Sequence, residues 1–377
     1  MKWLWNRRQR PTLKILDDFF PNLLTGFRVA EYNAIFSAFP RAQVLSAYPH
    51  FASCIEEYAR VHPEYARRVN IFEPRALDDC GLAYVNFLNN AVLFLDALES
   101  KAIPFVITLY PGGGFGLNET ESDYKLDRVL KSPLLKAIIV TQRVTRDYVI
   151  ARNRRSIPIH FVPGVVVNPS YFFPSVCRRK SENNVFHFCF VAEKYMEKGL
   201  NKGYPIFIEA AKSLALEREN IHFHVVGNFD SSDVMVTDIA NRIRFHGRLM
   251  TSELKGFFSR MDVIVSPNQP FLLHPGNFDG FPTGCCVEAS LCGVTVVATD
   301  ELKQNPGYRD GEDMLIVPPK SSVIADTLRN LVDHPDHCFS LGVRGQAMSR
   351  MFYAPSRQIG PRLNILKDMA KRHGVAL

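Results

Sequence analysis

The residues most suited to chemistry lie in one stretch, Phe278–Asp300, which reads FDGFPTGCCVEASLCGVTVVATD. It opens with an acidic residue and a tight turn, Asp279–Gly284, and continues into a short apolar run with one carboxylate, Glu288, inside it. Gly293 is a typical helix stop, and the β-branched run Val294–Ala298 predicts a buried strand. A turn, a helix and a strand in this order form half of a βαβ unit.

The glycines and the carboxylate of this stretch predict the chemistry of its ligand. Gly280 and Gly284 allow backbone N–H groups to approach a ligand closely, and the start of the following helix favours an anion such as phosphate. Glu288, about one turn into that helix, would accept hydrogen bonds from sugar hydroxyls but would repel phosphate. A ligand that carries both phosphates and hydroxyls satisfies both features. That ligand is a nucleotide-sugar.

Both carboxylates also have a structural interpretation. Asp is common as a helix N-cap or turn former, and this alternative applies to Asp279. It is weaker for Glu288, because a carboxylate between two apolar residues of a buried helix needs a partner, and a ligand can supply one.

Strands alternate with helices through the first half of the chain, which predicts a parallel sheet with helices on both faces. Two Gly-containing turns, at Gly26 and at Tyr110–Gly116, follow strands of this half, where ligands of open α/β sheets bind. The alternative is that these glycines only shape flexible turns. The expected strands are residues 14–20, 43–48, 82–86, 104–109, 137–141 and 159–162, and the expected helices are 27–39, 54–70, 91–100 and 143–152.

The alternation restarts after a hydrophilic segment near residues 175–184, so we predict two α/β domains and a terminal helix. The first domain spans residues 1–175, the second 176–355, and the terminal helical segment 356–377. In the second domain Thr251 is expected to cap a helix. The other expected elements are strands at 185–191, 221–226, 243–249, 261–266, 294–298 and 314–317 and helices at 204–216, 285–292, 321–332, 338–352 and 361–371.

The stretch Phe278–Asp300 resembles the donor-binding signature of retaining GT-B glycosyltransferases of family 4, the glycosyl transferases group 1. In that family an acidic residue, Gly-Phe and a second Glu precede an Ala-x-x-x-Gly run. The resemblance implies an α/β fold of the GT-B type, with two Rossmann-like doubly wound domains facing a central cleft. It also implies that Asp279 holds the donor sugar, that Glu288 holds the ribose and that the terminal helix crosses back to the first domain.

Four departures from the family pattern are visible. The first acidic residue is Asp279 instead of Glu, and eight residues rather than seven separate it from Glu288. Tyr110 stands where a His is common beside the reacting sugar. Ala192-Glu193 replaces a Gly-Arg pair whose Arg neutralises the diphosphate, so Lys194 becomes the candidate for that charge, while Lys202 matches the family's Lys-Gly.

These observations define a set of candidate site residues. The candidates for catalysis are Lys202, Asp279, Glu288 and Tyr110; for donor binding Lys194, Gly227, Arg248, Gly280, Phe281, Pro282, Thr283 and Gly284; and for the acceptor-side loops Gly26, Gly112, Gly113 and Gly114. No metal ligand cluster and no Asp-x-Asp motif is evident in the sequence, so neither a metal nor a cofactor is expected, and the nucleotide diphosphate sugar is a substrate.

Composition restricts the class of protein. The 377 residues are 46% hydrophobic and 22% charged, as in a globular protein large enough for two α/β domains. No run of eighteen apolar residues and no secretory signal occurs, and the eight scattered cysteines are typical of reduced thiols, so a cytoplasmic location is expected. No basic-aromatic array indicates nucleic acid.

The net charge of +7 falls mostly in residues 1–175. The terminal group Trp3, Trp5, Arg7, Arg8 and Arg10 would suit an anionic lipid surface, so peripheral contact of the first domain with the inner face of the cytoplasmic membrane is one expectation. A solvated terminus is the alternative.

The function expected from the sequence is transfer of a sugar from a nucleotide diphosphate sugar to a hydroxyl acceptor, as in a hexosyltransferase. Metal independence agrees with diphosphate stabilisation by helix ends and cations. The resemblance implies retention of anomeric configuration. The basic first domain and the Trp/Arg terminus motivate the hypothesis of a saccharide or lipid-linked saccharide acceptor in bacterial-type polysaccharide, lipopolysaccharide or glycan synthesis. The alternatives are a non-catalytic partner subunit of the same fold and a nucleotide-sugar epimerase, although no acid/base pair for an epimerase is apparent.

Overall fold

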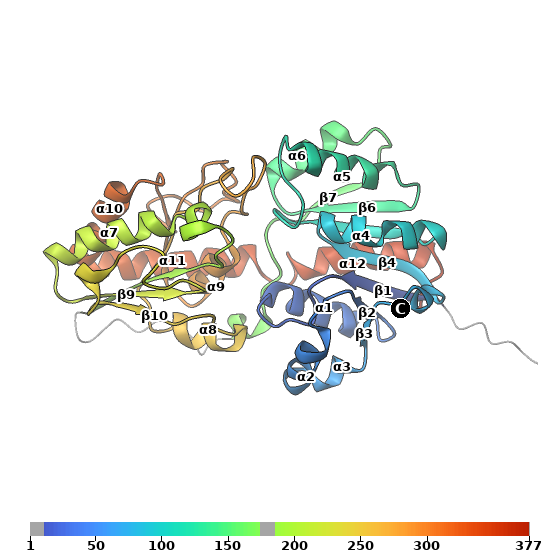
Figure 1. Cartoon of the computed structure of the whole chain (residues 1–377), viewed down its shortest axis with the longest axis horizontal. Coiled ribbons are helices and arrows are strands. Elements are labelled where there is room, and N and C mark those ends of the chain that lie inside the picture. Colours follow the sequence, from blue (N-terminus) through green and yellow to red (C-terminus); the bar gives the residue numbers. More distant parts are fainter. Residues whose placement is uncertain (1–10, 174–184, 377) are drawn as a thin grey trace, which may run out of the picture.

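The computed structural model describes residues 11–173 and 185–376. The aromatic and basic terminus around Trp3 and Arg10, on which the membrane expectation rests, lies outside these residues, and so does the hydrophilic segment at the predicted domain boundary. Figure 1 shows two lobes side by side, each a sheet covered by helices.

The first domain is built on a seven-stranded sheet in the order β3-β2-β1-β4-β5-β6-β7, in which every neighbouring pair is parallel. The order reverses between β1 and β4, and such a reversal opens a crevice at the carboxyl ends of the strands. The strands are β1 Thr12–Asp17, β2 Gln43–Ser46, β3 Val69–Ile71, β4 Cys80–Asn86, β5 Phe105–Leu109, β6 Leu135–Val140 and β7 Ile159–Phe161.

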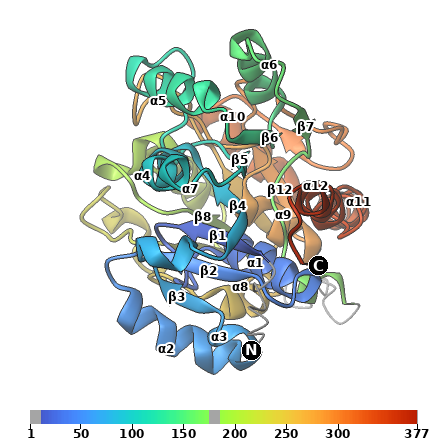
Figure 2. The same cartoon turned by 90° about the vertical axis from the view of Figure 1, so that its right-hand side faces the viewer.

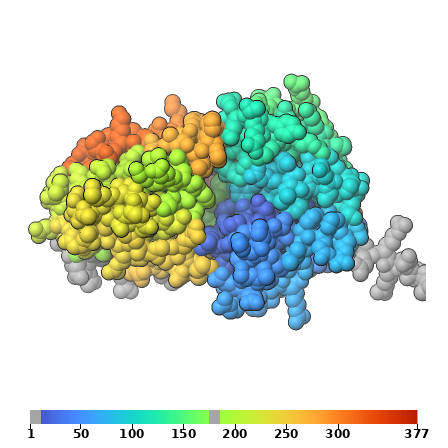
Figure 3. Space-filling model, in the orientation of Figure 1, coloured from blue at the N-terminus to red at the C-terminus, as the bar shows by residue number. Residues whose placement is uncertain are grey.

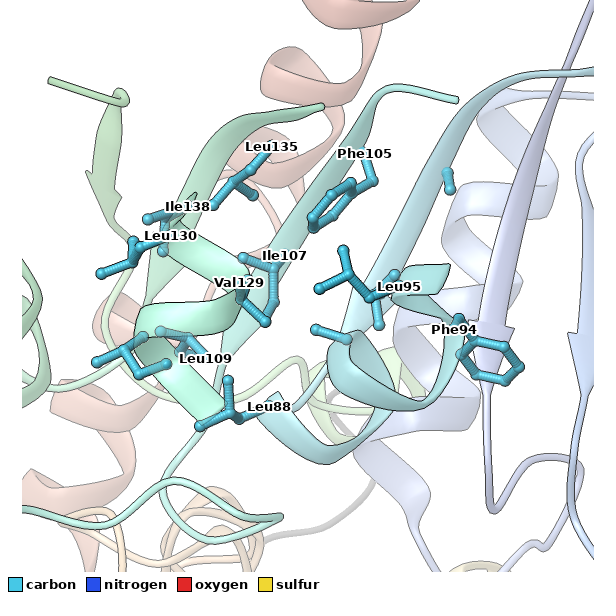
Figure 4. Close-up of a cluster of buried hydrophobic side chains, with 14 of the residues drawn as sticks. Leu88, Phe94, Leu95, Phe105, Ile107, Leu109, Val129, Leu130, Leu135 and Ile138 are labelled. Atoms are coloured by element: carbon cyan, nitrogen blue, oxygen red, sulfur yellow. The ribbon is translucent and has the colours of Figure 1, made fainter. Parts of the chain in front are cut away.

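Helices cover both faces of this sheet. On one face, Leu88 and Leu95 of α4 and Val129 of α5 pack over Phe105 and Ile107 of β5 (Figure 4). On the other face lie α1 and the terminal helix α12, and Figure 2 shows α4 and α12 on opposite sides of the strands. The helices are α1 Gly26–Ala38, α2 Phe51–Val61, α3 Pro63–Ala66, α4 Leu88–Ser100, α5 Thr120–Lys131, α6 Arg143–Arg152 and α12 Ile359–Arg372, with the 3₁₀ turn η1 Pro74–Leu77. The 3₁₀ turn η2 Pro169–Phe172 packs in the core of the second domain through Tyr171.

The second domain contains a six-stranded, entirely parallel sheet in the order β10-β9-β8-β11-β12-β13. Helices α7 and α10 pack on one face, and α8 and α9 pack on the other. Its strands are β8 Phe186–Val191, β9 Ile221–Val226, β10 Ile243–Phe245, β11 Val263–Ser266, β12 Thr295–Ala298 and β13 Leu315–Ile316. Its helices are α7 Tyr204–Glu217, α8 Thr251–Phe258, α9 Gly284–Leu291, α10 Ser321–Asp333 and α11 Pro335–Phe352, with 3₁₀ turns η3 Glu197–Lys202 and η4 Thr237–Ile239.

Three elements differ from the sequence-based expectations. Residues 54–70 are not one helix, because the segment contains the end of α2, the short α3 and the start of strand β3. Helix α5, between β5 and β6, was not predicted. Thr251 is the first residue of α8 rather than its cap; the cap is Met250, and the Thr251 hydroxyl donates to the Leu23 carbonyl of the first domain at 3.0 Å.

The chain passes between the domains at two neighbouring places. Val162 belongs to the core of the first domain, whereas Val167 packs in the core of the second. On the return, Tyr353 belongs to the second core and Leu366 of α12 to the first. The two crossing segments contact each other, because the Gln358 side-chain amide donates a hydrogen bond to the Pro163 carbonyl at 2.5 Å.

A fully buried carboxylate, Glu31 of α1, joins helices α1 and α12 to the sheet of the first domain. It accepts hydrogen bonds from the hydroxyls of Tyr84 and of Tyr110, the latter at 2.9 Å, and from the Asn86 amide at 3.2 Å. The Arg362 guanidinium of α12 lies 3.5 Å from it, and both side chains have no solvent exposure. None of the described helices is long and apolar enough to span a bilayer.

We expect Arg362→Met to lower the free energy of unfolding by about 3–5 kcal/mol, because it leaves Glu31 as a buried, uncompensated charge. The double variant Glu31→Gln/Arg362→Met should recover most of this loss. The surface pair between Arg372 and Asp368, with side chains 64% and 52% exposed, is the control. Arg372→Met should cost about 0–1 kcal/mol in chemical denaturation. Equal losses for both single Arg variants would contradict this account.

Candidate functional site

A cavity of about 810 Å³ lies between the two domains, at the carboxyl ends of the strands of both sheets. The space-filling view shows the two lobes meeting along a seam with a hollow between them (Figure 3). The first domain contributes segments that follow β1, β4, β5 and β6, and the second contributes segments that follow β8 and β11. Both crevices therefore open into one space, as parallel α/β sheets require when they share a ligand.

The predicted donor turn forms the second-domain wall of this cavity. Asp279, Gly280, Pro282, Thr283 and Gly284 line it, and α9 begins at Gly284, so the N-terminal end of the helix faces the cleft. Amide groups at such an end, with the helix dipole, favour an anion.

The turn is fixed against the first domain by Gln142, the residue before α6. Its side-chain oxygen accepts from the Phe281 amide at 3.4 Å, and a side chain on Gly280 would come within 2.8 Å of its nitrogen. Phe281 itself packs in the second core and does not line this cavity, and its predicted donor contact stays a prediction.

Lys202 and Asp279 meet on the second-domain wall of the cavity. The Lys202 Nζ lies 2.6 Å from Asp279 Oδ1, and the second carboxylate oxygen accepts from the Asn268 amide at 2.6 Å. Burial alone would lower the pKa of Lys202, but the Asp279 carboxylate outweighs burial and raises that pKa above its ordinary value. Lys202 is therefore a cation although only 8% of its surface is exposed. The left-handed Gly203 that follows lets the loop pass the Pro267 carbonyl, with which a side chain would collide.

Glu288 lies one turn inside α9, behind the cavity rather than on its wall. Burial raises the pKa of its carboxyl to about 8, and the neighbouring Cys285 adds to this shift. Burial and Glu288 likewise raise the pKa of Tyr171, whose buried hydroxyl has no hydrogen-bond partner among the residues described. The predicted ribose contact of Glu288 stays a prediction.

Three of the predicted donor residues lie away from the cavity. The Lys194 Nζ donates to both carboxylate oxygens of Asp233, at 2.8 and 2.9 Å, and Lys194 does not line the cavity. The structure therefore does not support its proposed role at the diphosphate. Arg248 pairs with Glu193 and is half exposed. Gly227, with φ of +126°, allows close packing beside Ala192 at the ends of β8 and β9.

The first-domain wall contains the predicted glycine loop. Gly112, Gly113 and Gly114 line the cavity with φ of +73°, +54° and +89°. Side chains at the last two positions would collide with Phe87 and Asn89, so the loop requires glycine there.

Tyr110 and Gly26 occupy positions different from those expected. The Tyr110 residue borders the cavity, but its hydroxyl donates inward to Glu31, and burial raises its pKa strongly. A catalytic role for that hydroxyl therefore has no support from its position. Gly26 faces Thr251 of α8, where an added side chain would come within 2.8 Å, so it serves the contact between domains rather than the cavity wall.

Several cavity residues were missed by the sequence analysis. Gln142 follows the end of β6 and Arg28 lies in the first turn of α1 after β1, so the rule that ligands bind beyond strand ends could have indicated both. Tyr195, Asn201 and His274 come from second-domain loops without a motif of their own, and no sequence signal marked them.

Comparisons with known proteins agree with this geometry. Residues 186–334 match the family model described as glycosyl transferases group 1, and no curated protein sequence gives a significant match. The structure of HepE from Anabaena in complex with UDP aligns with 96% of this chain and 100% of its own, at 15% identity and a TM-score of 0.71. The chain has the GT-B fold.

Two further solved structures share the GT-B fold. Sucrose-phosphate synthase from Thermosynechococcus elongatus aligns with 96% of this chain and 100% of its own, at 13% identity and a TM-score of 0.66. A glycosyltransferase from Rickettsia africae aligns with 96% and 99%, at 11% identity and a TM-score of 0.70. At such identities the likeness concerns the GT-B fold alone, and the cavity described above is its interdomain cleft.

The raised pKa of Glu288 predicts a pH dependence of stability. Because the folded carboxyl has a pKa of about 8 against an ordinary value of 4.5, only the unfolded chain loses its proton between these values. The contribution to stability is complete below pH 4.5 and is lost as pH rises to about 8, on the order of a few kcal/mol. Glu288→Gln should lack this loss. The melting temperature of the wild type should therefore fall relative to that of Glu288→Gln between pH 5 and pH 8. Parallel melting profiles for the two proteins would contradict the assignment.

Proposed function

We propose that the protein is a glycosyltransferase that transfers a sugar from a nucleotide diphosphate sugar to a hydroxyl acceptor. The observation that carries the proposal is the meeting of Lys202, Asp279 and the start of α9 on one wall of a cleft that both domains close. The match of residues 186–334 to the glycosyl transferases group 1 model supports it.

The cleft supplies the groups that such a transfer needs. In the proposed reaction the bond between the anomeric carbon and the diphosphate oxygen breaks, a bond to the acceptor oxygen forms, and the acceptor loses a proton. Lys202 and the amides around Gly284 would stabilise the charge that develops on the departing diphosphate. Asp279, 2.6 Å from Lys202, would hold sugar hydroxyls next to it. Glu288 remains the candidate for the ribose.

Further details belong to the proposal. UDP is the first candidate nucleotide, because HepE structures are known with UDP and with UDP-glucose. We propose retention of configuration, independence of metal ions and a hexosyl donor. The acceptor, a saccharide or lipid-linked saccharide of a bacterial-type glycan pathway, would enter along Gly112–Gly114. The proposed place of action is the cytoplasm, with peripheral contact to anionic lipid through the first domain.

A second candidate is a non-catalytic subunit that binds the nucleotide-sugar without turnover. The inward-facing Tyr110 hydroxyl and the absence of Lys194 from the cavity lining favour it. An assay for free nucleoside diphosphate separates the enzyme from the non-catalytic subunit. The protein is incubated with a panel of nucleotide-sugars and saccharide acceptors, and only the enzyme accumulates this product.

Lys202→Met should weaken nucleotide diphosphate binding by about 10–100-fold, the effect of losing one charge-assisted hydrogen bond. The measurement is thermal shift with UDP, GDP, CDP and dTDP, with and without Mg²⁺. Lys198→Met is the matched control, because this lysine belongs to the same loop, is 53% exposed and pairs only with Glu197 among the described residues. We expect one nucleotide to stabilise the wild type and the control but not Lys202→Met. A wild type that no nucleotide stabilises would reject the proposed function.

A further inference from the structure

A diphosphate carries more than one negative charge, and Lys202 alone does not balance it. The Lys202 ammonium is already paired with Asp279 at 2.6 Å. Lys194 and Arg248 are paired with Asp233 and Glu193 outside the cavity. The remaining Lys and Arg side chains of the described cavity lining are Arg28 and Lys125, both from the first domain.

Arg28 is held rigidly at the cavity wall, in the first turn of α1. Its guanidinium lies 4.5 Å from the centre of the Phe87 ring and 5.3 Å from that of Phe19. Its Nη1 donates to Asp17 at 2.7 Å and lies 3.4 Å from Asp18. Only 9% of the residue is exposed, and Nη2 makes no hydrogen bond to any described residue. The guanidinium therefore has a fixed place and an unused donor beside the cavity.

Asp17 pairs with Arg28 through Nη1 only, which leaves Nη2 available to a ligand. That carboxylate also accepts from the amides of Phe19 and Phe20, at 2.7 and 2.6 Å, and from the Tyr32 hydroxyl at 2.6 Å. These donors stabilise the Asp17 carboxylate and hold it in place beside Arg28, and the Asp18 side chain is 43% exposed to solvent. Burial would lower the pKa of Arg28, but Asp17 raises it, so the guanidinium stays charged.

Arg28 and Lys202 line the same cavity from opposite domains. The Lys202 Nζ lies 5.3 Å from the centre of the Tyr195 ring. Burial raises the pKa of Tyr195, and the charges of Lys202 and Arg28 both act to lower it. The two cations thus belong to opposite walls of one cavity, which Tyr195 also lines.

We propose that Arg28 is the second cation of the diphosphate site and binds the phosphates from the first domain, opposite Lys202. This assignment rests on the proposed function. Arginine suits the role, because its planar fork donates two bonds to one phosphate. A diphosphate held by both residues also links the two domains, so nucleotide binding closes the cleft.

Lys125 provides the comparison within the same cavity. Its Nζ donates to Glu121 at 2.6 Å, four residues earlier on α5, and to Asn89 at 3.1 Å. A carboxylate on its own helix thus balances its charge.

The test is calorimetric titration of the wild type, Arg28→Met, Arg28→Lys and Lys125→Met. The titrants are UDP, GDP, CDP and dTDP, and then the nucleoside of the diphosphate that binds. Arg28→Met keeps the stem over Phe87 and should weaken the diphosphate by about 10-fold or more, with the nucleoside unaffected. Arg28→Lys should recover part of the affinity, and Lys125→Met should match the wild type.

The opposite results separate the explanations. If the wild type binds a diphosphate and Arg28→Met binds it equally well, the assignment of Arg28 is wrong while the proposed function stands. An effect confined to the KM of the acceptor also overturns the assignment, because it places Arg28 on an anionic acceptor instead. If the wild type binds none of the four, the proposed function itself fails. Should Arg28→Met not fold, Asp17→Asn/Arg28→Met removes both members of the buried pair and is titrated in its place.

Discussion

The buried carboxylate of Glu31 is the constraint on which the first-domain half of the cleft depends. It has no solvent exposure, so its polar oxygens are satisfied only by Tyr84, Tyr110, Asn86 and Arg362, which surround it. These partners come from β4, from the end of β5 and from α12, and Glu31 itself belongs to α1. The glycine loop begins at Gly112, two residues after Tyr110. The interaction that stabilises the domain therefore also sets the position of the cleft wall. Tyr110 is therefore a structural member of the site, and the loop after it is the part that meets a ligand.

On the second-domain wall the main interaction is electrostatic and remains available to a ligand. Lys202 and Asp279 neutralise each other at 2.6 Å within a largely buried site, which avoids the cost of an isolated charge in the cleft. A ligand that offers an anion to the lysine and hydroxyls to the aspartate can replace this contact on both sides at once. Neither a simple anion nor a neutral sugar does both. The pair thus favours a molecule in which the two kinds of group are adjacent.

The sequence predicted the fold well and the site in part, for a physical reason. Alternating apolar runs and turn residues are local, and they placed most strands and the turn at Asp279 within a few residues of their positions. Strand β3 was missed because it is three residues long and follows polar helices. Side-chain partners are not local. Lys194 meets Asp233, which lies 39 residues away, and Arg362 meets Tyr110 across 252 residues, so no spacing in the sequence marks either contact. Arg28 was overlooked because its neighbours Asp17 and Phe87 become neighbours only after β1 and β4 pair.

The two adjacent chain crossings have a mechanical consequence. Two covalent connections that lie side by side and are joined by Gln358 and Pro163 resist translation of one domain past the other, but they leave rotation about their own position almost free. The two domains can therefore rotate relative to each other, with the two crossing segments as the hinge. In such a rotation the displacement of a residue grows with its distance from the hinge. Besides the two crossings, hydrogen bonds join the domains from the Leu117 amide to the Gly276 carbonyl at 2.8 Å, from the Val144 amide to the Gln304 side chain at 2.8 Å and from the Thr251 hydroxyl to the Leu23 carbonyl at 3.0 Å. Access to the cleft would then depend on how often these few polar contacts break together.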